Sequence, residues 1–327
     1  MRTVGVFAAL LTLCCTDPDP TAAVPDAHTN SHGDSTTGGT VAEPEPSPDA
    51  VRHTPCPPET KVGEFRVELF DAYTAVQGQV SDGVDPAQVP GETRVEGDCA
   101  LLQPIARFCD PGCPSGETCG DNGCVPRPQN VDIGEVVISG LSAPVAMTAA
   151  APVFFYSHRG ELPHPGFTPG AAITLQLRGG VDPLTLAVTG IEPVSALAES
   201  PRLLRTQPLT IRWSAPAGPA VARVHLELNI ANHGGTPAWI QCDVPDTGTY
   251  TMDAALITAL LDLGFSGYPT LSLSRRTVDS APLTSGCVEF LAVHTTVADV
   301  EIPGLVSCSD DADCPDGETC RVDLTCG

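Results

Sequence analysis

Hydrophobic and polar residues alternate along several short segments of this 327-residue chain, and each such segment predicts a β-strand. Residues 63–70 place Phe65, Val67 and Leu69 on one face and polar side chains on the other. Residues 223–230 alternate in the same way over eight positions. Further runs occupy residues 72–80, 172–178, 209–213, 271–275 and 287–293. Segments rich in Gly, Pro and Asp separate the runs. We therefore expect a mainly β fold, an antiparallel sandwich of the immunoglobulin-like kind.

One segment departs from this alternation and predicts a short α-helix. Asp253 suits the N-cap position, and Gly264 suits the C-terminal cap. Between them the apolar residues recur with helical spacing, which gives one buried stripe. The stripe consists of Leu256, Ile257, Leu260 and Leu261.

Composition changes sharply along the chain and indicates five parts. Residues 16–54 contain no Leu, Ile, Met, Phe, Tyr or Trp, so they cannot bury enough apolar area to fold. We expect a signal segment at 1–15, a disordered tether at 16–54 and a small β unit with a Cys-rich repeat at 55–128. The sandwich is expected at 129–306 and a second Cys-rich repeat at 307–327.

The first fifteen residues contain one basic residue, Arg2, then an apolar run from 4 to 13, then Cys14 and Cys15. This arrangement resembles a bacterial lipoprotein signal. The resemblance implies export and lipid attachment at Cys14 or Cys15. The apolar run is too short to cross a bilayer, which needs about 20 residues. The alternatives are secretion without a lipid and no export. In either case both cysteines would simply be part of the apolar run.

The clearest motif is an internal repeat of four cysteines. Residues 113–119 (CPSGETC) and 314–320 (CPDGETC) differ at one position. Neither copy contains a histidine or the C-x2-C pair of zinc ribbons, so both predict disulfide-linked modules. The eight cysteines are Cys109, Cys113, Cys119, Cys124, Cys308, Cys314, Cys320 and Cys326. The repeats and the signal together resemble bacterial surface lipoproteins with Cys-rich extracellular repeats.

Outside the repeats we expect two further disulfides, because every block of cysteines after the signal is even in number. Cys56 and Cys99 enclose the small β unit and are expected to pair. Cys242 and Cys287 are the two cysteines of the sandwich and are expected to pair across about 45 residues.

Charge limits the partners of the chain. The formal net charge is −24, and Lys61 is the only lysine among 16 basic residues. No basic cluster is visible in the sequence, so we expect no nucleic-acid binding. High Ala, Pro, Gly and Arg with almost no Lys is typical of a GC-rich bacterial genome.

Few residues suggest reaction chemistry. Residues 158–164 contain two His and one Glu that could hold a metal, although Gly160 and Pro163 favour a loop. The acidic C-terminal repeat could hold structural calcium. Asp246 begins an Asp-Thr-Gly-Thr-Tyr sequence, which we interpret as a β-turn because a protease would need a second copy. The metal candidates are His158, Glu161, His164, Asp311, Asp313 and Asp316.

No nucleophile motif, phosphate loop or dinucleotide fingerprint is present, so no catalytic residue and no cofactor are predicted. We therefore expect an exported protein, at the cell surface or outer membrane through a lipid anchor or else extracellular. Its expected role is binding or adhesion to an extracellular protein or glycan. The alternative is an extracellular hydrolase acting on carbohydrate or peptide.

Overall fold

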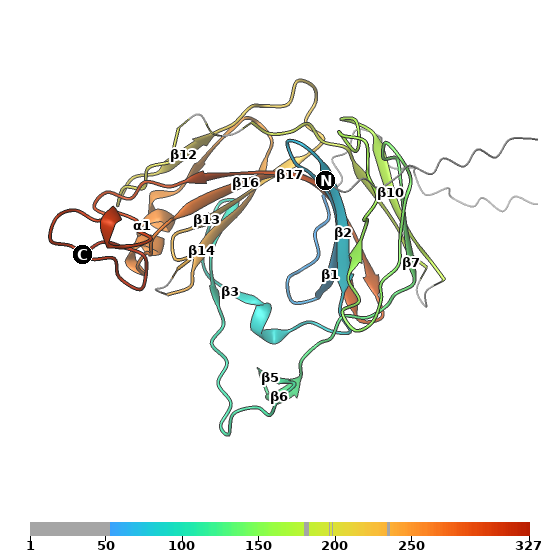
Figure 1. Ribbon diagram of the computed structural model, residues 1–327, viewed down its shortest axis with the longest axis horizontal. Coiled ribbons are helices and arrows are strands. Elements are labelled where there is room, and N and C mark those ends of the chain that lie inside the picture. Colours follow the sequence, from blue (N-terminus) through green and yellow to red (C-terminus); the bar gives the residue numbers. More distant parts are fainter. Residues whose placement is uncertain (1–52, 180–182, 196, 198, 234–235) are drawn as a thin grey trace, which may run out of the picture. The chain divides into compact units, whose positions relative to one another are not determined.

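The computed structural model describes residues 53–327, except 180–182, 196, 198 and 234–235 (Figure 1). The predictions for residues 1–15, including lipidation of Cys14 or Cys15, and for the tether up to residue 52 lie outside the described residues.

A nine-stranded sheet dominates the described part of the chain. From one edge to the other its strands are β3 (Pro90–Glu96), β4 (Cys99–Pro104), β14 (Trp239–Pro245), β13 (Arg223–Asn229), β16 (Thr270–Leu283), β17 (Gly286–Asp299), β1 (Lys61–Leu69), β2 (Thr74–Val80) and β9 (Tyr156–Ser157).

The other elements are smaller. A four-stranded sheet contains β11 (Thr185–Thr189), β10 (Ala172–Arg178), β7 (Glu135–Ser139) and β8 (Val145–Met147). Two strand pairs are β12 (Leu209–Arg212) with β15 (Thr249–Met252), and β5 (Glu117–Gly120) with β6 (Gly123–Pro126). The helices are α1 (Ala254–Asp262) and two 3-10 turns, η1 (Pro86–Gln88) and η2 (Asp311–Asp313). The predicted mainly β class with one short α-helix is confirmed.

The sheet contains one pairing that alternation could not predict. Among the named strands, every pair is antiparallel except β1 with β17, which is parallel. These two strands are not joined by a hairpin, so the connection does not fix their relative direction. The sheet is also wider than an immunoglobulin-type sandwich requires.

Two hydrophobic cores lie along the large sheet. The first core packs β13, β14 and the start of β16 against α1, β12 and β15; fully buried Leu226, Ile240 and Leu256 belong to it. The second core packs β1, β2 and the start of β17 against the four-stranded sheet, and includes Phe65 and Phe290. The hairpin of β16 and β17, with 14 residues in each strand, contributes to both cores.

The helix forms as its sequence predicts. The Asp253 side chain accepts a hydrogen bond from the backbone N–H of Ala255, 2.6 Å away, and so caps the first turn. Gly264 has a φ of +99°, the left-handed conformation that a residue after the helix end adopts most easily when it is glycine. The buried face is the expected one, with Leu256, Ile257, Leu260 and Leu261 all in the first core.

The domain boundary predicted at residue 128 does not separate two β units. Strands β1 to β4, from the expected small unit, are part of the nine-stranded sheet together with strands of the expected sandwich. Alternation shows that a segment is a strand and which face it buries, but it does not show which strand lies beside it.

The structure forms six disulfides among the twelve cysteines from Cys56 onward, but two predicted pairings are wrong. Cys99 pairs with Cys242, because β4 and β14 are neighbours and place these residues directly opposite each other. Cys56 pairs with Cys287 at the start of β17. Pairing the cysteines within each predicted domain failed because both bonds join segments more than 140 residues apart.

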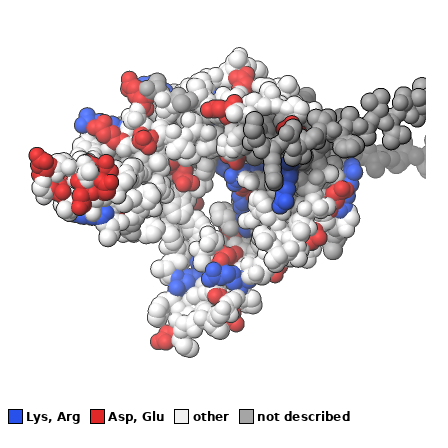
Figure 2. All heavy atoms as spheres, in the orientation of Figure 1, with Lys and Arg blue, Asp and Glu red and all other residues white. Residues whose placement is uncertain are grey.

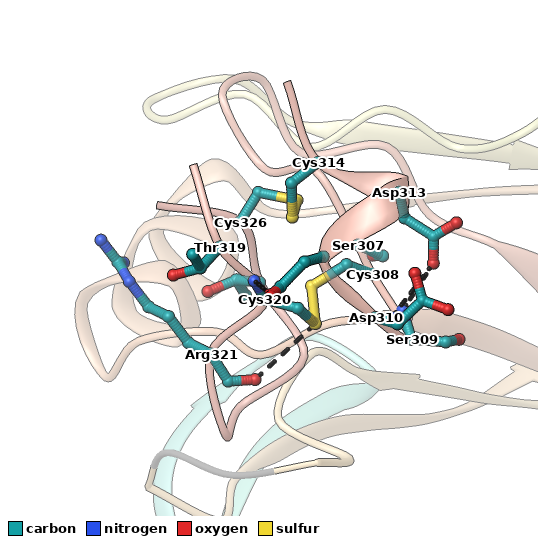
Figure 3. Close-up of a disulfide and its surroundings, with 12 residues drawn as sticks. Ser307, Cys308, Ser309, Asp310, Asp313, Cys314, Thr319, Cys320, Arg321 and Cys326 are labelled. Carbon is teal, nitrogen blue, oxygen red and sulfur yellow. Dashed lines mark hydrogen bonds between the residues drawn. A yellow bond between two sulfur atoms is a disulfide. The ribbon is translucent and has the colours of Figure 1, made fainter. Parts of the chain in front are cut away.

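The two Cys-rich modules share one connectivity. In each, the first cysteine is bonded to the third and the second to the fourth, as Figure 3 shows for the C-terminal module. The similarity of their sequences therefore extends to their structure. The bonds are Cys109–Cys119, Cys113–Cys124, Cys308–Cys320 and Cys314–Cys326.

Six disulfides indicate that the protein folds in an oxidising environment. Over the described residues, no helix has both the length and the apolar character needed to cross a membrane.

Candidate functional site

One face of the nine-stranded sheet is polar in its central part and carries a hollow of about 710 Å³. Its walls come from residues 53–61, which precede and begin β1, and from β13, β14, β16 and β17. Figure 2 shows Lys and Arg atoms gathered around a recess near the middle of the view. The charged lining residues are Lys61, Arg223, Asp243, Asp246, Arg276 and Glu289.

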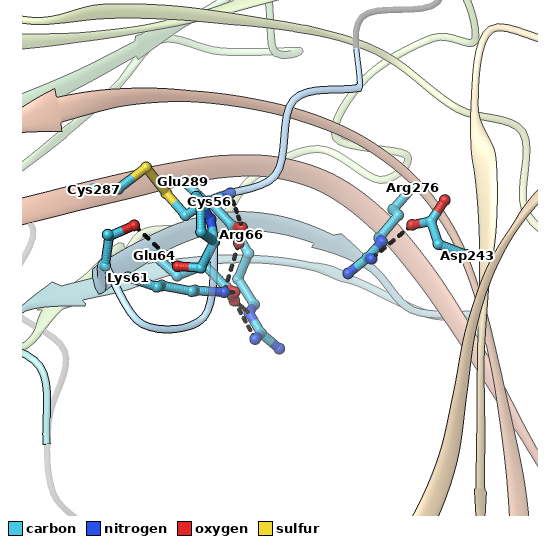
Figure 4. Close-up of polar contacts among 10 residues, drawn as sticks. Cys56, Lys61, Glu64, Arg66, Asp243, Arg276, Cys287 and Glu289 are labelled. Carbon is cyan, nitrogen blue, oxygen red and sulfur yellow. Dashed lines mark hydrogen bonds and ion pairs between the residues drawn. A yellow bond between two sulfur atoms is a disulfide. The ribbon is translucent and has the colours of Figure 1, made fainter. Parts of the chain in front are cut away.

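Asp243 is at the centre of a charged cluster in this hollow. Its carboxylate accepts hydrogen bonds from Arg276 Nη2 at 2.9 Å and from Arg223 Nε, and lies 2.8 Å from His53 Nε2. Figure 4 shows Arg276 pointing toward Asp243. Burial alone would raise the pKa of Asp243, but the bonds from His53, Arg223 and Arg276 hold it far below its usual range. Asp243 is therefore ionised at any physiological pH.

The two arginines of this cluster face each other across neighbouring strands. Arg223 of β13 and Arg276 of β16 are register partners. Like charges directly opposite each other destabilise a sheet, so this pair needs a compensating anion. Asp243 supplies one negative charge against two positive ones. Arg276 Nε is also buried without a hydrogen-bond partner in the described structure.

A second group, centred on Lys61, closes the other side of the hollow. Lys61 Nζ lies 2.5 Å from Glu289 Oε2 and 2.6 Å from Glu64 Oε2. The other oxygen of Glu289 accepts the backbone N–H of Cys56 at 2.7 Å (Figure 4). Burial opposes the charge of Lys61, but Glu64 and Glu289 outweigh it and raise its pKa above the usual value. Together with the Cys56–Cys287 bond, these contacts hold residues 56–61 against β17.

His225 lies beside the Asp243 cluster, since it is the register partner of Asp243 on the neighbouring strand. Its Nδ1 is buried and has no hydrogen-bond partner in the described structure. Burial first, and then the charge of Arg276, lower the pKa of His225 to about 3. The imidazole is therefore neutral at physiological pH.

The stability of the protein is expected to fall as the pH is lowered from 7 to 5. The unfolded chain protonates His225 near pH 6.5, whereas the folded protein does so only near pH 3. The stabilisation is therefore present above pH 6.5 and is lost as the pH falls toward 3. Between pH 7 and pH 5, the protonation of His225 in the unfolded chain lowers the free energy of unfolding by about 2 kcal/mol at most. Urea unfolding at both pH values would measure it.

His225→Gln is the comparison that isolates this effect. His294, whose pKa burial lowers, changes stability in the same direction; Glu227, whose pKa burial raises, changes it in the opposite one. Both remain in the variant, so the difference between the two pH slopes belongs to His225. Equal slopes in the two proteins would contradict the prediction.

A second hollow of about 470 Å³ adjoins the first and shares Pro58, Gln241 and Asp243 with it. Its other charged residues are all acidic: Glu59, Glu92 and Asp98. Apolar side chains of Val89, Val95 and Leu102 complete much of its wall. The sheet face therefore changes from a cationic region near Arg223 and Arg276 to an acidic region near β3.

The structure does not bring His158, Glu161 and His164 together as metal ligands. His164 Nδ1 lies 3.4 Å from the Thr74 hydroxyl, and Glu161 is exposed in the connecting loop. Among the described residues, the only groups of three or more His, Cys, Asp or Glu at ligand spacing are cysteines. These cysteines already form disulfides, which leaves them without thiolates for a metal. Gly160 and Pro163 keep the segment non-helical, so residues three positions apart do not lie on one face and their side chains do not meet.

The acidic residues of the C-terminal module help to fold it. Asp311 accepts the backbone N–H of Cys320 at 2.8 Å, and Asp313 accepts that of Ser309 at 2.7 Å. Asp316 is exposed. Their oxygens do not form a group at ligand spacing. Figure 2 shows acidic atoms clustered at the left end of the view, where Figure 1 places the C-terminus.

One further hollow, of about 530 Å³, contains His294 with Ser195, Ser214 and Asp71. Burial lowers the pKa of His294 and keeps its ring neutral. Its Nδ1 accepts the backbone N–H of Val194 at 3.2 Å, so the proton is on Nε2, which lies 4.0 Å from exposed Asp71. The ring therefore has no nitrogen left to accept a serine proton, and this set is not arranged for nucleophilic catalysis.

Sequence reasoning missed the Asp243 cluster, although one signal was present. Arg223, His225 and Glu227 alternate with apolar residues on one strand, which places them on one face. The sequence does not show that His53 and Asp243, from distant segments, lie against that face.

The chain matches no known protein family, and a search of curated proteins finds no related sequence.

Proposed function

We propose that this protein is an exported, lipid-anchored surface protein that binds an extracellular ligand in the hollow over β13, β14, β16 and β17. The observation that supports binding is the hollow itself: about 710 Å³, within the usual range for ligand sites, with convergent charged side chains. The six disulfides and the lipoprotein-like first fifteen residues support export.

Binding is tested with the full chain, purified with its native N-terminus, on glycan and peptide arrays. Gln241 lines both adjoining hollows, so Gln241→Trp places a large side chain in them. We expect this variant to lose at least tenfold in affinity for any ligand that the wild type captures. Gln176→Trp, on an exposed position of β10, is the matched control and should bind normally. Equal binding by wild type and Gln241→Trp would refute the site.

The anchor is tested by mass spectrometry of the N-terminal peptide isolated from the native host. A diacylglyceryl group on Cys14 or Cys15 is the expected result. A mature N-terminus without lipid, or an intact signal segment, would show the anchor proposal to be wrong.

A further inference from the structure

We propose that the hollow binds a small ligand through one oxyanion group, a carboxylate, phosphate or sulfate, held by Arg223 and Arg276. This inference deepens the proposed binding function and rests on it. The occupied position would lie beside Asp243, on the polar face of the sheet.

The first support is the balance of charge in the hollow. Asp246 is neutralised by Arg275, with Nε to Oδ2 at 2.6 Å, and Glu289 is paired with Lys61. This leaves Arg223 and Arg276, two positive charges, against Asp243, one negative charge. The side chains of Arg223 and Arg276 are 28% and 17% exposed, so water offsets the excess positive charge only in part. Partly buried charges of this kind are normally paired, and an anion would complete the pairing.

The second support is the set of N–H groups that Asp243 does not use. Arg276 gives Nη2 to Asp243, and its Nε is buried without a partner. Arg223 Nε donates a hydrogen bond to the carboxylate of Asp243, and Arg223 Nη2 donates one to the backbone carbonyl of Asp243 at 2.5 Å. Within the described residues, the Nη1 of each arginine makes no hydrogen bond. Guanidinium donors in this number suit a carboxylate or a tetrahedral oxyanion.

The third support concerns the overall size and charge of the ligand. The adjoining hollow presents Glu59, Glu92 and Asp98, and the whole chain carries a net charge of −24. Both the acidic side chains of the adjoining hollow and the net negative charge of the whole chain would repel a polyanion. A small ligand with one oxyanion group and a neutral or cationic remainder avoids it, because the remainder would lie toward the acidic hollow.

Calorimetric titration of the full chain with acetate, inorganic phosphate and sulfate, at low ionic strength, tests this proposal and distinguishes the oxyanion types. We expect saturable binding of at least one of them. Arg223→Gln and Arg276→Gln should each weaken it at least tenfold. Arg94→Gln, which removes an exposed arginine paired with Glu96, should change it less than twofold.

Asp243→Asn gives the sharper result, because removing the competing carboxylate should tighten anion binding severalfold. A merely structural role for Asp243 would weaken binding instead. If this variant does not fold, the two arginine variants against Arg94→Gln decide the question. No binding of any of the three anions, or equal weakening by Arg94→Gln, would overturn the proposal.

The outcome is separable from that of the proposed function. An array ligand that Gln241→Trp abolishes, but that Arg223→Gln and Arg276→Gln leave unchanged, would refute the oxyanion site and leave the binding function standing.

Discussion

Replacing Asp246 by Asn is expected to lower the free energy of unfolding by about 3–5 kcal/mol, because it leaves the charge of Arg275 buried and unpaired. Arg275 and Asp246 are 2% and 1% exposed at their side chains. Asp246 binds Nε and Nη2 of Arg275 and also accepts the indole N–H of Trp213 at 2.8 Å.

The rest of the Arg275 guanidinium shows why the cost is high. Its remaining donors bind three backbone carbonyls, those of Glu192, Pro193 and Ser214, at 2.5–3.2 Å. One side chain thus connects β16 to the loops between the two cores, and the loss of its counter-ion weakens all of these contacts together.

Asp262→Asn is the matched control for this prediction. Asp262 also pairs with an arginine, Arg205, but the two side chains are 60% and 54% exposed. Exposed pairs contribute at most about 1 kcal/mol, so this variant should remain near wild type. Urea unfolding of both variants measures the difference. A loss below about 1 kcal/mol in Asp246→Asn would show that the buried pair is not needed for stability.

Removing the Cys56–Cys287 disulfide is expected to cost about 4–5 kcal/mol in the chain-entropy treatment, because the bond closes a very long loop. The two cysteines are 231 residues apart in the sequence, although the nested Cys99–Cys242 bond shortens the loop that is effectively closed. The variant is Cys56→Ser with Cys287→Ser, so that no free thiol remains. The expected effect is a lower midpoint in thermal and chemical unfolding.

The C-terminal module provides the comparison for this variant. Cys314→Ser with Cys326→Ser removes a bond between residues 12 apart, which is expected to contribute about 3 kcal/mol at most. That loss should be confined to the module and leave the main unfolding transition unchanged. If the midpoint of the main unfolding transition falls equally in both double variants, the Cys56–Cys287 bond does not stabilise the protein by closing a long loop.

The strands and the helix were predictable because their signals are local. Phe65, Val67 and Leu69 alternate along β1, and all three are buried in the second core. Asp253 and Gly264 mark the helix ends through the conformations of single residues. Such signals depend on neighbours within a few positions, so one sequence contains them in full.

The partners of the strands were not predictable, and the errors follow from this. The sequence places Cys287 at the start of an alternating run, but it does not show that Cys242 lies opposite Cys99. The burial of Arg275 is a second feature that the sequence did not predict. It occupies a core-facing position after Leu271 and Leu273, where the alternation predicts an apolar residue. The charge of Arg275 is tolerated in the core because Asp246, which lies in the connection between β14 and β15, pairs with it.

The candidate site was hidden for the same reason. Its residues come from the segment before β1 and from β13, β14, β16 and β17, which are far apart in the chain. The predicted metal candidates, in contrast, were chosen because they are close in sequence. Closeness in sequence within a loop that contains Gly160 and Pro163 does not give a shared ligand position.

The Cys56–Cys287 bond also determines how the chain would carry a mechanical load. If the two ends are pulled apart, force that enters at residue 56 passes through the disulfide to residue 287, at the start of β17. The intervening segment, which includes β13, β14 and β16, is bypassed. Beyond residue 287 the disulfides of the C-terminal module close much of what remains. The extensible length of the described protein is thereby reduced mainly to β17 and the residues up to 307. Under tension the disulfide protects β13, β14 and β16, but not β17, which carries Glu289 of the hollow.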